Sequence, residues 1–216
     1  MDPSVPKERR LRFLALGDSH TIGEAVEHAQ SWPLQLAALL RGRGVAVDDP
    51  VIVAKTGWTT AELMEGIDEA QPEGVFDLVS LLVGVNDQYR ERDAEEYRKE
   101  FGTLLDRAIR LAGGEKSRVV VLSIPDWGAT PYAEGKDRGK VAEEIDRFNE
   151  INRKEAGVAG VHYLDITGVS REAANDPALL AEDGLHPSGR MHARWACLAF
   201  EEMFPGIAPH PSNRDG

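Results

Sequence analysis

Five short apolar runs, separated by longer amphipathic segments, constrain the fold of this chain more than any other feature of its sequence. The runs are rich in leucine and β-branched residues and are apolar on both faces in places, as in the strands of a covered parallel sheet. They occupy residues 11–16, 51–55, 78–83, 119–124 and 161–166. The intervening segments carry apolar residues at helical spacing. They predict helices at 32–42, 60–69, 94–112, 138–155 and after Ser188.

This alternation of strands and helices predicts a single three-layer α/β/α domain with a mostly parallel sheet, spanning residues 11–204. Local signals support the helix starts, since Asp93 precedes one helix as a candidate N-cap and Pro33 lies in the first turn of another. The polar or proline-rich ends, residues 1–10 and 205–216, are expected to be flexible tails.

The charge of the chain excludes several classes of partner. There are 25 Lys and Arg against 37 Asp and Glu, which gives a formal net charge of −12. Such a surface repels nucleic acids and anionic lipid heads. No apolar stretch is long enough for a transmembrane helix, so no integral membrane association is expected. The polar start does not resemble a secretory signal, which favours a cytoplasmic location. The sequence makes no prediction of oligomeric state.

No metal site or cofactor is expected from the cysteine and histidine content. Cys197 is the only cysteine, which excludes an intrachain disulfide and a zinc site built on thiolates. It lies in an apolar stretch and is expected to be buried. Four histidines lack a neighbouring partner pattern and are expected to be ordinary surface or core residues: His28, His162, His192 and His210.

Polar motifs follow the first three predicted strands. Gly17-Asp18-Ser19 follows the first, Gly57 the second and Gly84-Val85-Asn86-Asp87 the third, while Asp183-Gly184-Leu185-His186-Pro187 precedes the last helix. Ligands of such sheets bind outside the carboxyl ends of the strands. Each motif alone also fits an ordinary turn, cap or loop, and Asp18 and Asp87 are expected to brace loops by hydrogen bonds. Their combination favours one shared site.

The chemistry of these motifs fits acyl transfer. A serine such as Ser19 becomes a nucleophile when a base takes its proton, and His186 is a candidate base. Asp183, three residues earlier, can hold that imidazole in one tautomer. Gly57 offers a backbone N–H and Asn86 an uncharged amide, both of which can donate to an oxyanion.

At these residues the chain resembles the SGNH hydrolases, also called the GDSL esterase/lipase family. The resemblance implies a flavodoxin-like fold with five parallel strands and a serine esterase that works through an acyl-enzyme. It implies a catalytic triad of Ser19, His186 and Asp183. It also implies an oxyanion hole from the N–H groups of Ser19 and Gly57 and the side chain of Asn86. The chain departs from the family name at His20, where the motif has leucine.

Residues beside the motifs are candidates for contact with a small-molecule ester. Those expected to bind substrate are His20, Trp58, Trp127 and Tyr132. Residues 124–139 are expected to form a wall or lid of the cleft, and the loop 86–93 to lie beside it. Alternatives within the same chemistry are a thioesterase, a lysophospholipase or a carbohydrate deacetylase. Alternatives outside it are a flavodoxin-like module that binds a phosphate or flavin, which the lack of a glycine-rich cradle disfavours, and a catalytically inactive scaffold.

Overall fold

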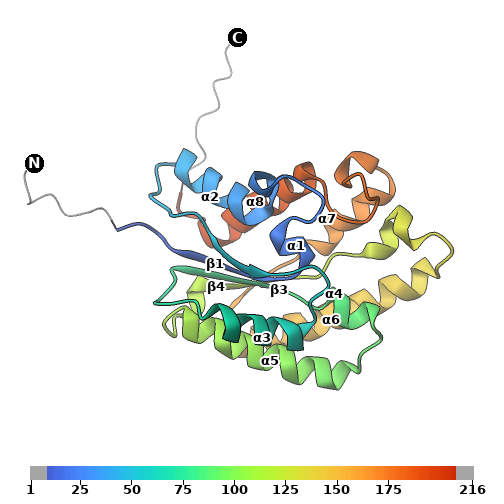
Figure 1. The fold of residues 1–216 in the computed structure, drawn as a ribbon, viewed down its shortest axis with the longest axis horizontal. Coiled ribbons are helices and arrows are strands. Elements are labelled where there is room, and N and C mark those ends of the chain that lie inside the picture. Colours follow the sequence, from blue (N-terminus) through green and yellow to red (C-terminus); the bar gives the residue numbers. More distant parts are fainter. Residues whose placement is uncertain (1–8, 208–216) are drawn as a thin grey trace, which may run out of the picture.

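A five-stranded parallel sheet lies between two layers of helices in the computed structural model, which describes residues 9–207 (Figure 1). The strand order is β2-β1-β3-β4-β5, which is the flavodoxin-like order. The strands are β1 (Phe13–Gly17), β2 (Val51–Ala54), β3 (Leu78–Leu82), β4 (Val119–Leu122) and β5 (His162–Leu164).

The helices cover both faces of this sheet. In Figure 1, α2, α7 and α8 lie on one face, and α3, α5 and α6 lie on the other. The α-helices are α1 (Ser19–Ile22), α2 (Trp32–Gly42), α3 (Thr60–Ala70), α4 (Val85–Tyr89), α5 (Ala94–Leu111), α6 (Arg138–Ala159), α7 (Thr167–Arg171) and α8 (Gly189–Met203). Short 3₁₀ turns are η1 (His28–Gln30), η2 (Lys116–Arg118), η3 (Trp127–Ala129), η4 (Pro131–Ala133), η5 (Glu172–Ala174) and η6 (Pro177–Leu179).

The central strands are buried on both faces, which explains their unbroken apolar sequences. Every residue of β1, β3 and β4 is buried. On one face, Trp32 of α2 packs its ring 5.9 Å from that of Phe13. On the other face, Tyr97 and Phe101 of α5 are fully buried and 5.7 Å apart between ring centroids. Burial of this apolar surface drives the three layers together.

The structure confirms the predicted fold class and its five strands, although β4 and the edge strand β5 each end two residues earlier than predicted. β5 ends at Leu164, although its apolar pattern predicts a strand over 161–166. Ile166 is already helical as the N-cap of α7, and the N–H groups of Ile166 and Thr167 donate to Ser123 Oγ at 2.8 Å and 3.0 Å. The predicted domain limits stay a prediction, and residues 1–8 and 208–216 of the predicted tails lie outside the described residues.

Two expectations differ from the structure in detail. Cys197 is exposed, which corrects its predicted burial, because α8 turns Trp195 and Ala196 toward the core and the next residue toward solvent. The sequence also does not predict α1, α4 and α7, which have only four or five residues and carry no measurable periodicity. Among residues 9–207, no helix is both long and apolar enough to cross a membrane.

Gly84 should tolerate no side chain at the start of α4. Its φ is +131°, and a Cβ there would lie 2.3 Å from Oη of the fully buried Tyr97. Gly84→Ala should therefore lower the free energy of unfolding, measured in urea, by about 2 kcal/mol more than Gly114→Ala. Gly114 is the matched control, because its φ is +84° but a Cβ would meet nothing within 4 Å. Equal losses in the two variants would contradict this account.

Candidate active site

The polar motifs meet in one pocket at the carboxyl edge of the sheet. We call it the Ser19 pocket, and its volume is about 160 Å³. Its lining residues are Ser19, His20, Thr56, Gly57, Val85, Asn86, Tyr89, Trp127, Tyr132, Leu185 and His186. The candidate nucleophile, the candidate base and both additional oxyanion donors thus lie around one cavity, although they come from four separate segments. Their catalytic roles stay a prediction at this point.

Ser19 is the first residue of α1, directly beyond β1. Asp18 is the N-cap of this helix, and its Oδ1 accepts the backbone N–H of His20 at 2.9 Å. N–H groups in the first turn of a helix have no partner within that helix, so the N–H of Ser19 is available to a ligand. The helix stops after one turn at Gly23, which has a φ of +78°. The predicted loop around Ser19 is therefore a capped helical turn, and Ser19 is only 4% exposed.

Asp183 orients His186 within a single loop. Its Oδ2 lies 2.6 Å from His186 Nδ1, and its Oδ1 accepts the N–H groups of Leu185 at 3.0 Å and of His186 at 2.9 Å. Burial opposes ionisation of this carboxyl, but these hydrogen bonds outweigh burial and lower the pKa of Asp183. With the carboxylate holding the proton on Nδ1, Nε2 remains as the basic nitrogen of His186.

Asn86 and Gly57 are held by contacts between α4 and the loop after β2. Asn86 Nδ2 donates to the carbonyl of Trp58 at 2.9 Å and lies 3.5 Å from Asp18 Oδ2. Gly57 has a φ of +83°, and its carbonyl accepts Arg90 Nη2 at 2.6 Å. The carbonyl of Trp58 fixes the side-chain amide of Asn86, and the positive φ sets the direction of the Gly57 peptide. Both candidate donors are therefore oriented by the protein itself.

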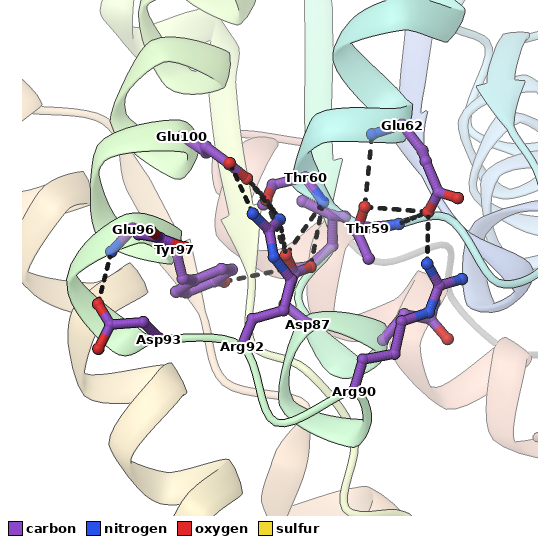
Figure 2. Close-up of polar contacts among 12 residues, drawn as sticks. Thr59, Thr60, Glu62, Asp87, Arg90, Arg92, Asp93, Glu96, Tyr97 and Glu100 are labelled. Atoms are coloured by element: carbon purple, nitrogen blue, oxygen red, sulfur yellow. Dashed lines mark hydrogen bonds and ion pairs between the residues drawn. The ribbon is translucent and has the colours of Figure 1, made fainter.

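Asp87 anchors the short helix α4 to α3 and α5. Figure 2 shows this carboxylate between Thr60 and Arg92, with Glu100 beyond the guanidinium. Asp87 is 0% exposed and accepts Thr60 N at 3.0 Å, Thr60 Oγ1 at 2.8 Å and Arg92 Nη1 at 3.1 Å. Arg92 also donates to both oxygens of Glu100, at 2.7 Å and 2.8 Å. The bracing roles expected of Asp87 and Asp18 are confirmed by these contacts.

Burial disfavours the charged form of Asp87. Burial raises the pKa of Asp87, and the hydrogen bonds from Thr60 and the nearby guanidinium of Arg92 offset this only in part. The guanidinium itself is held charged, because hydrogen bonding to Glu100 outweighs its partial burial and raises the pKa of Arg92. A buried carboxylate of this kind depends on each of its donors.

Three of the four predicted substrate contacts line the pocket, and one does not. His20, Trp127 and Tyr132 are lining residues. Trp58 is absent from the lining, and its ring lies against Gly66 of α3, where an added Cβ would come within 2.1 Å of the indole. Tyr89 also lines the pocket, whereas the sequence predicts only that its loop, 86–93, lies beside the site. The three-residue spacing from Asn86 would have placed both on one face of a helix, had α4 been predicted.

A third histidine, His192, is fully buried on α8 and does not line the pocket. Its ring centroid is 5.3 Å from that of Trp195, which in turn lies 6.3 Å from His20. Neither ring nitrogen of His192 has a hydrogen-bond partner within residues 9–207. Burial, with smaller effects from the charges that His20 and His186 can carry, lowers the pKa of His192 to about 3. This imidazole is therefore neutral at the pH at which His186 would act as a base.

Comparison with known proteins gives a family match and structural relatives. The model of the GDSL-like Lipase/Acylhydrolase family matches residues 15–194. A search of curated proteins finds no significant match.

Three crystal structures of known proteins share the fold. The structure of TesA is 18% identical with a TM-score of 0.70, and the alignment covers 90% of this chain and 98% of TesA. Axe2, an acetylxylan esterase from Geobacillus stearothermophilus, is 20% identical with a TM-score of 0.68 and coverages of 90% and 94%. EstA, an esterase from Pseudoalteromonas sp. inhibited by monoethylphosphonate, is 14% identical with a TM-score of 0.68 and coverages of 89% and 96%.

Removal of the Thr60 hydroxyl should destabilise the protein. Thr60→Val keeps the side-chain shape but deprives the buried carboxylate of Asp87 of one donor, which typically costs about 1–3 kcal/mol. The free energy of unfolding in urea measures this loss. Thr103→Val is the matched control, because Thr103 is exposed on α5 and its hydroxyl donates to the carbonyl of Lys99 in its own helix. A loss no larger than that of the control would contradict the anchoring role of Asp87.

Stability should fall in acid partly because of His192. The pKa of His192 is about 3 in the folded state and near 6.5 in the unfolded chain, so between these pH values the unfolded chain binds a proton that the folded protein does not. His192 therefore does not lower the free energy of unfolding above pH 6.5. Below pH 6.5 it lowers this free energy by up to about 1.4 kcal/mol per pH unit.

His192→Leu should remove that part of the slope in urea unfolding between pH 7 and pH 5. His28→Leu serves as the control, because His28 is exposed on η1. Identical slopes in the wild type and the His192 variant would show that folding does not lower the pKa of this imidazole.

Proposed function

The chain belongs to the GDSL-like lipase/acylhydrolase family, and from this premise we propose that it is a serine hydrolase that cleaves carboxylic esters through an acyl-enzyme intermediate. The observation that carries the proposal is the joint presence of Ser19, Gly57, Asn86 and His186 around one pocket. The hydrogen bond between Asp183 and His186 supplies the orientation that a catalytic base needs.

In the proposed first half-reaction, Ser19 Oγ attacks the carbonyl carbon of the ester. Nε2 of His186 accepts the serine proton, because Nδ1 is bound to Asp183. The carboxylate then stabilises the imidazolium that forms, and its lowered pKa keeps it charged throughout. The imidazolium returns the proton to the leaving alkoxide, so that the alcohol departs and Ser19 carries the acyl group.

The negative charge that develops on the carbonyl oxygen needs donors that are already in place. We assign this role to the N–H groups of Ser19 and Gly57 and to the side-chain amide of Asn86. Support comes from the capped turn at Ser19 and from the carbonyl of Trp58, which fixes the amide of Asn86. Removal of one such donor typically lowers kcat by about 10²–10³.

The second half-reaction repeats these steps with water. His186 takes a proton from water, the hydroxide attacks the acyl-enzyme carbonyl, and the same donors bind the second oxyanion. Collapse of this intermediate breaks the ester bond to Ser19, whose oxygen takes the proton from His186, and releases the carboxylic acid. Thioesters and the oxygen esters of lysophospholipids would pass through the same steps, so a thioesterase or lysophospholipase would use the same residues. Among the possible substrates, the small pocket favours those with a short acyl group.

Ser19→Ala should abolish ester hydrolysis and leave the fold intact. We expect wild-type protein to hydrolyse a chromogenic acetyl ester and to be labelled once by an organophosphonate, with the label located at Ser19 by mass spectrometry. The Ser19 variant should lose both properties while keeping the circular dichroism spectrum and melting temperature. Ser117→Ala is the matched control, because Ser117 is exposed in η2 on a separate part of the chain. Undiminished hydrolysis by the Ser19 variant would refute the proposal.

A further inference from the structure

Three aromatic side chains form one side of the Ser19 pocket. We call Tyr89, Trp127 and Tyr132 the aromatic wall; their ring centroids are 5.3 Å apart for Tyr89 and Trp127 and 6.1 Å apart for Trp127 and Tyr132. Tyr89 is 47% exposed and Tyr132 is 49% exposed. Large aromatic surfaces that stay exposed around a cavity mark ligand-binding sites. The proposed chemistry does not use this wall, so its role concerns what the pocket binds.

The aromatic wall is held in place by hydrogen bonds. Trp127 Nε1 donates to Gln88 Oε1 at 2.8 Å, and Gln88 Nε2 donates to Glu144 of α6 at 2.8 Å. The backbone N–H of Tyr132 donates to the carbonyl of Gly184 at 3.3 Å, which connects the wall to the loop of His186. The hydroxyls of Tyr89 and Tyr132 lie 3.1 Å apart. A surface fixed in this way loses little side-chain entropy when a ligand binds.

The pocket offers no ionic partner for a substrate whose leaving group is charged. Among the residues that line it, within the described part of the chain, none is Asp, Glu, Lys or Arg. Arg90 follows Tyr89 in sequence, but its guanidinium bonds to the carbonyl of Gly57 and to Glu62 at 3.2 Å. The net charge of −12 also repels anions. A phosphate-bearing leaving group, such as the alcohol of a lysophospholipid or the thiol of coenzyme A, therefore fits poorly.

Polar groups nevertheless lie beside the aromatic surface. His20 Nδ1 lies 3.1 Å from Asp18 Oδ1, so Nε2 is the ring nitrogen available to a ligand. The two tyrosine hydroxyls each retain capacity for a further hydrogen bond beyond their mutual contact. An alkyl chain in the pocket would exclude water from these groups without replacing its hydrogen bonds, which is unfavourable. A ligand that fits must combine an apolar face with hydroxyl groups at its edge.

We propose that the alcohol part of the substrate is an uncharged hydroxylated ring, and that the substrate is a short-chain acyl ester of a carbohydrate. The inference rests on the serine-hydrolase function proposed above and names its substrate class. The C–H face of the sugar ring lies against the aromatic wall, and a ring hydroxyl donates to His20 Nε2. The pocket volume of about 160 Å³ leaves room for a short acyl group beside Ser19; an apolar cavity of roughly 150 Å³ elsewhere holds one benzene molecule.

The test compares four esters with wild-type protein: a mono-O-acetylated methyl glucoside, cyclohexyl acetate, ethyl acetate and ethyl octanoate. Cyclohexyl acetate has the ring size of the glucoside without its hydroxyls. The kcat/KM for the glucoside acetate should exceed that for cyclohexyl acetate at least about tenfold, the equivalent of one or two hydrogen bonds. Ethyl octanoate should be hydrolysed more slowly than ethyl acetate.

Variants of the aromatic wall then test whether this wall causes the preference for the glucoside acetate. Tyr132→Leu should lower the ratio of kcat/KM for the glucoside acetate over ethyl acetate by about fivefold to tenfold, mainly through KM, because the loss of one stacked ring typically has this size. Tyr132→Phe, the matched control, keeps the ring and should lose less. Tyr89→Leu provides a second, independent change on α4. A ratio that stays at the wild-type value in both leucine variants would refute the role of the wall.

The two proposals fail in different ways. If wild-type protein hydrolyses none of the four esters and Ser19 is not labelled by the phosphonate, the serine-hydrolase function itself is wrong. If ethyl acetate is hydrolysed but the glucoside acetate is no better than cyclohexyl acetate, the carbohydrate inference alone is wrong. Faster hydrolysis of ethyl octanoate than of every acetate would likewise refute it, and would assign the aromatic wall to a long acyl chain.

Discussion

Parallel, in-register pairing of β1, β2 and β3 is the constraint on which the site depends. Gly17, the last residue of β1, pairs with Ala54 at the end of β2 and with Leu82 at the end of β3. The three strands therefore stop at the same level of the sheet, and the segments that follow them emerge side by side. Strand pairing alone therefore brings residues that are far apart in sequence to one edge of the sheet, without any contribution from side-chain contacts.

Polar contacts then fix the orientation that the strands alone leave open. The carboxylate of Asp18 caps the turn of Ser19 and contacts His20, and that of Asp87 joins α4 to its neighbours. Asn86 binds the carbonyl of Trp58 across the gap between two of the emerging segments. Burial of Asp87 disfavours its charged form, so the contact that anchors the helix carrying Asn86 lowers the stability of the fold to some extent. Donors prepared in this way need no rearrangement when an oxyanion forms.

The fold and the candidate site were predictable to different extents. Buried strands have unmistakable apolar runs, and the polar motifs at their ends stand out because catalysis needs particular residue types. Short helices such as α4 lack a full period, so the placement of Tyr89 beside Asn86 was not predicted. The inward turn of Trp58 depends on the missing side chain of Gly66, a tertiary fit without a local signal. The apolar stretch around Cys197 gave a misleading signal, because one side of a helix faces solvent even where its sequence is apolar.

The early end of β5 has a consequence for solubility. An edge strand exposes unpaired backbone groups that can recruit a strand from another molecule, and a very short edge limits this hazard. β5 contributes only three residues before the chain turns into α7, where Ser123 Oγ accepts the N–H groups of Ile166 and Thr167. The turn into α7 therefore leaves only a three-residue edge at this margin of the sheet for pairing with another molecule.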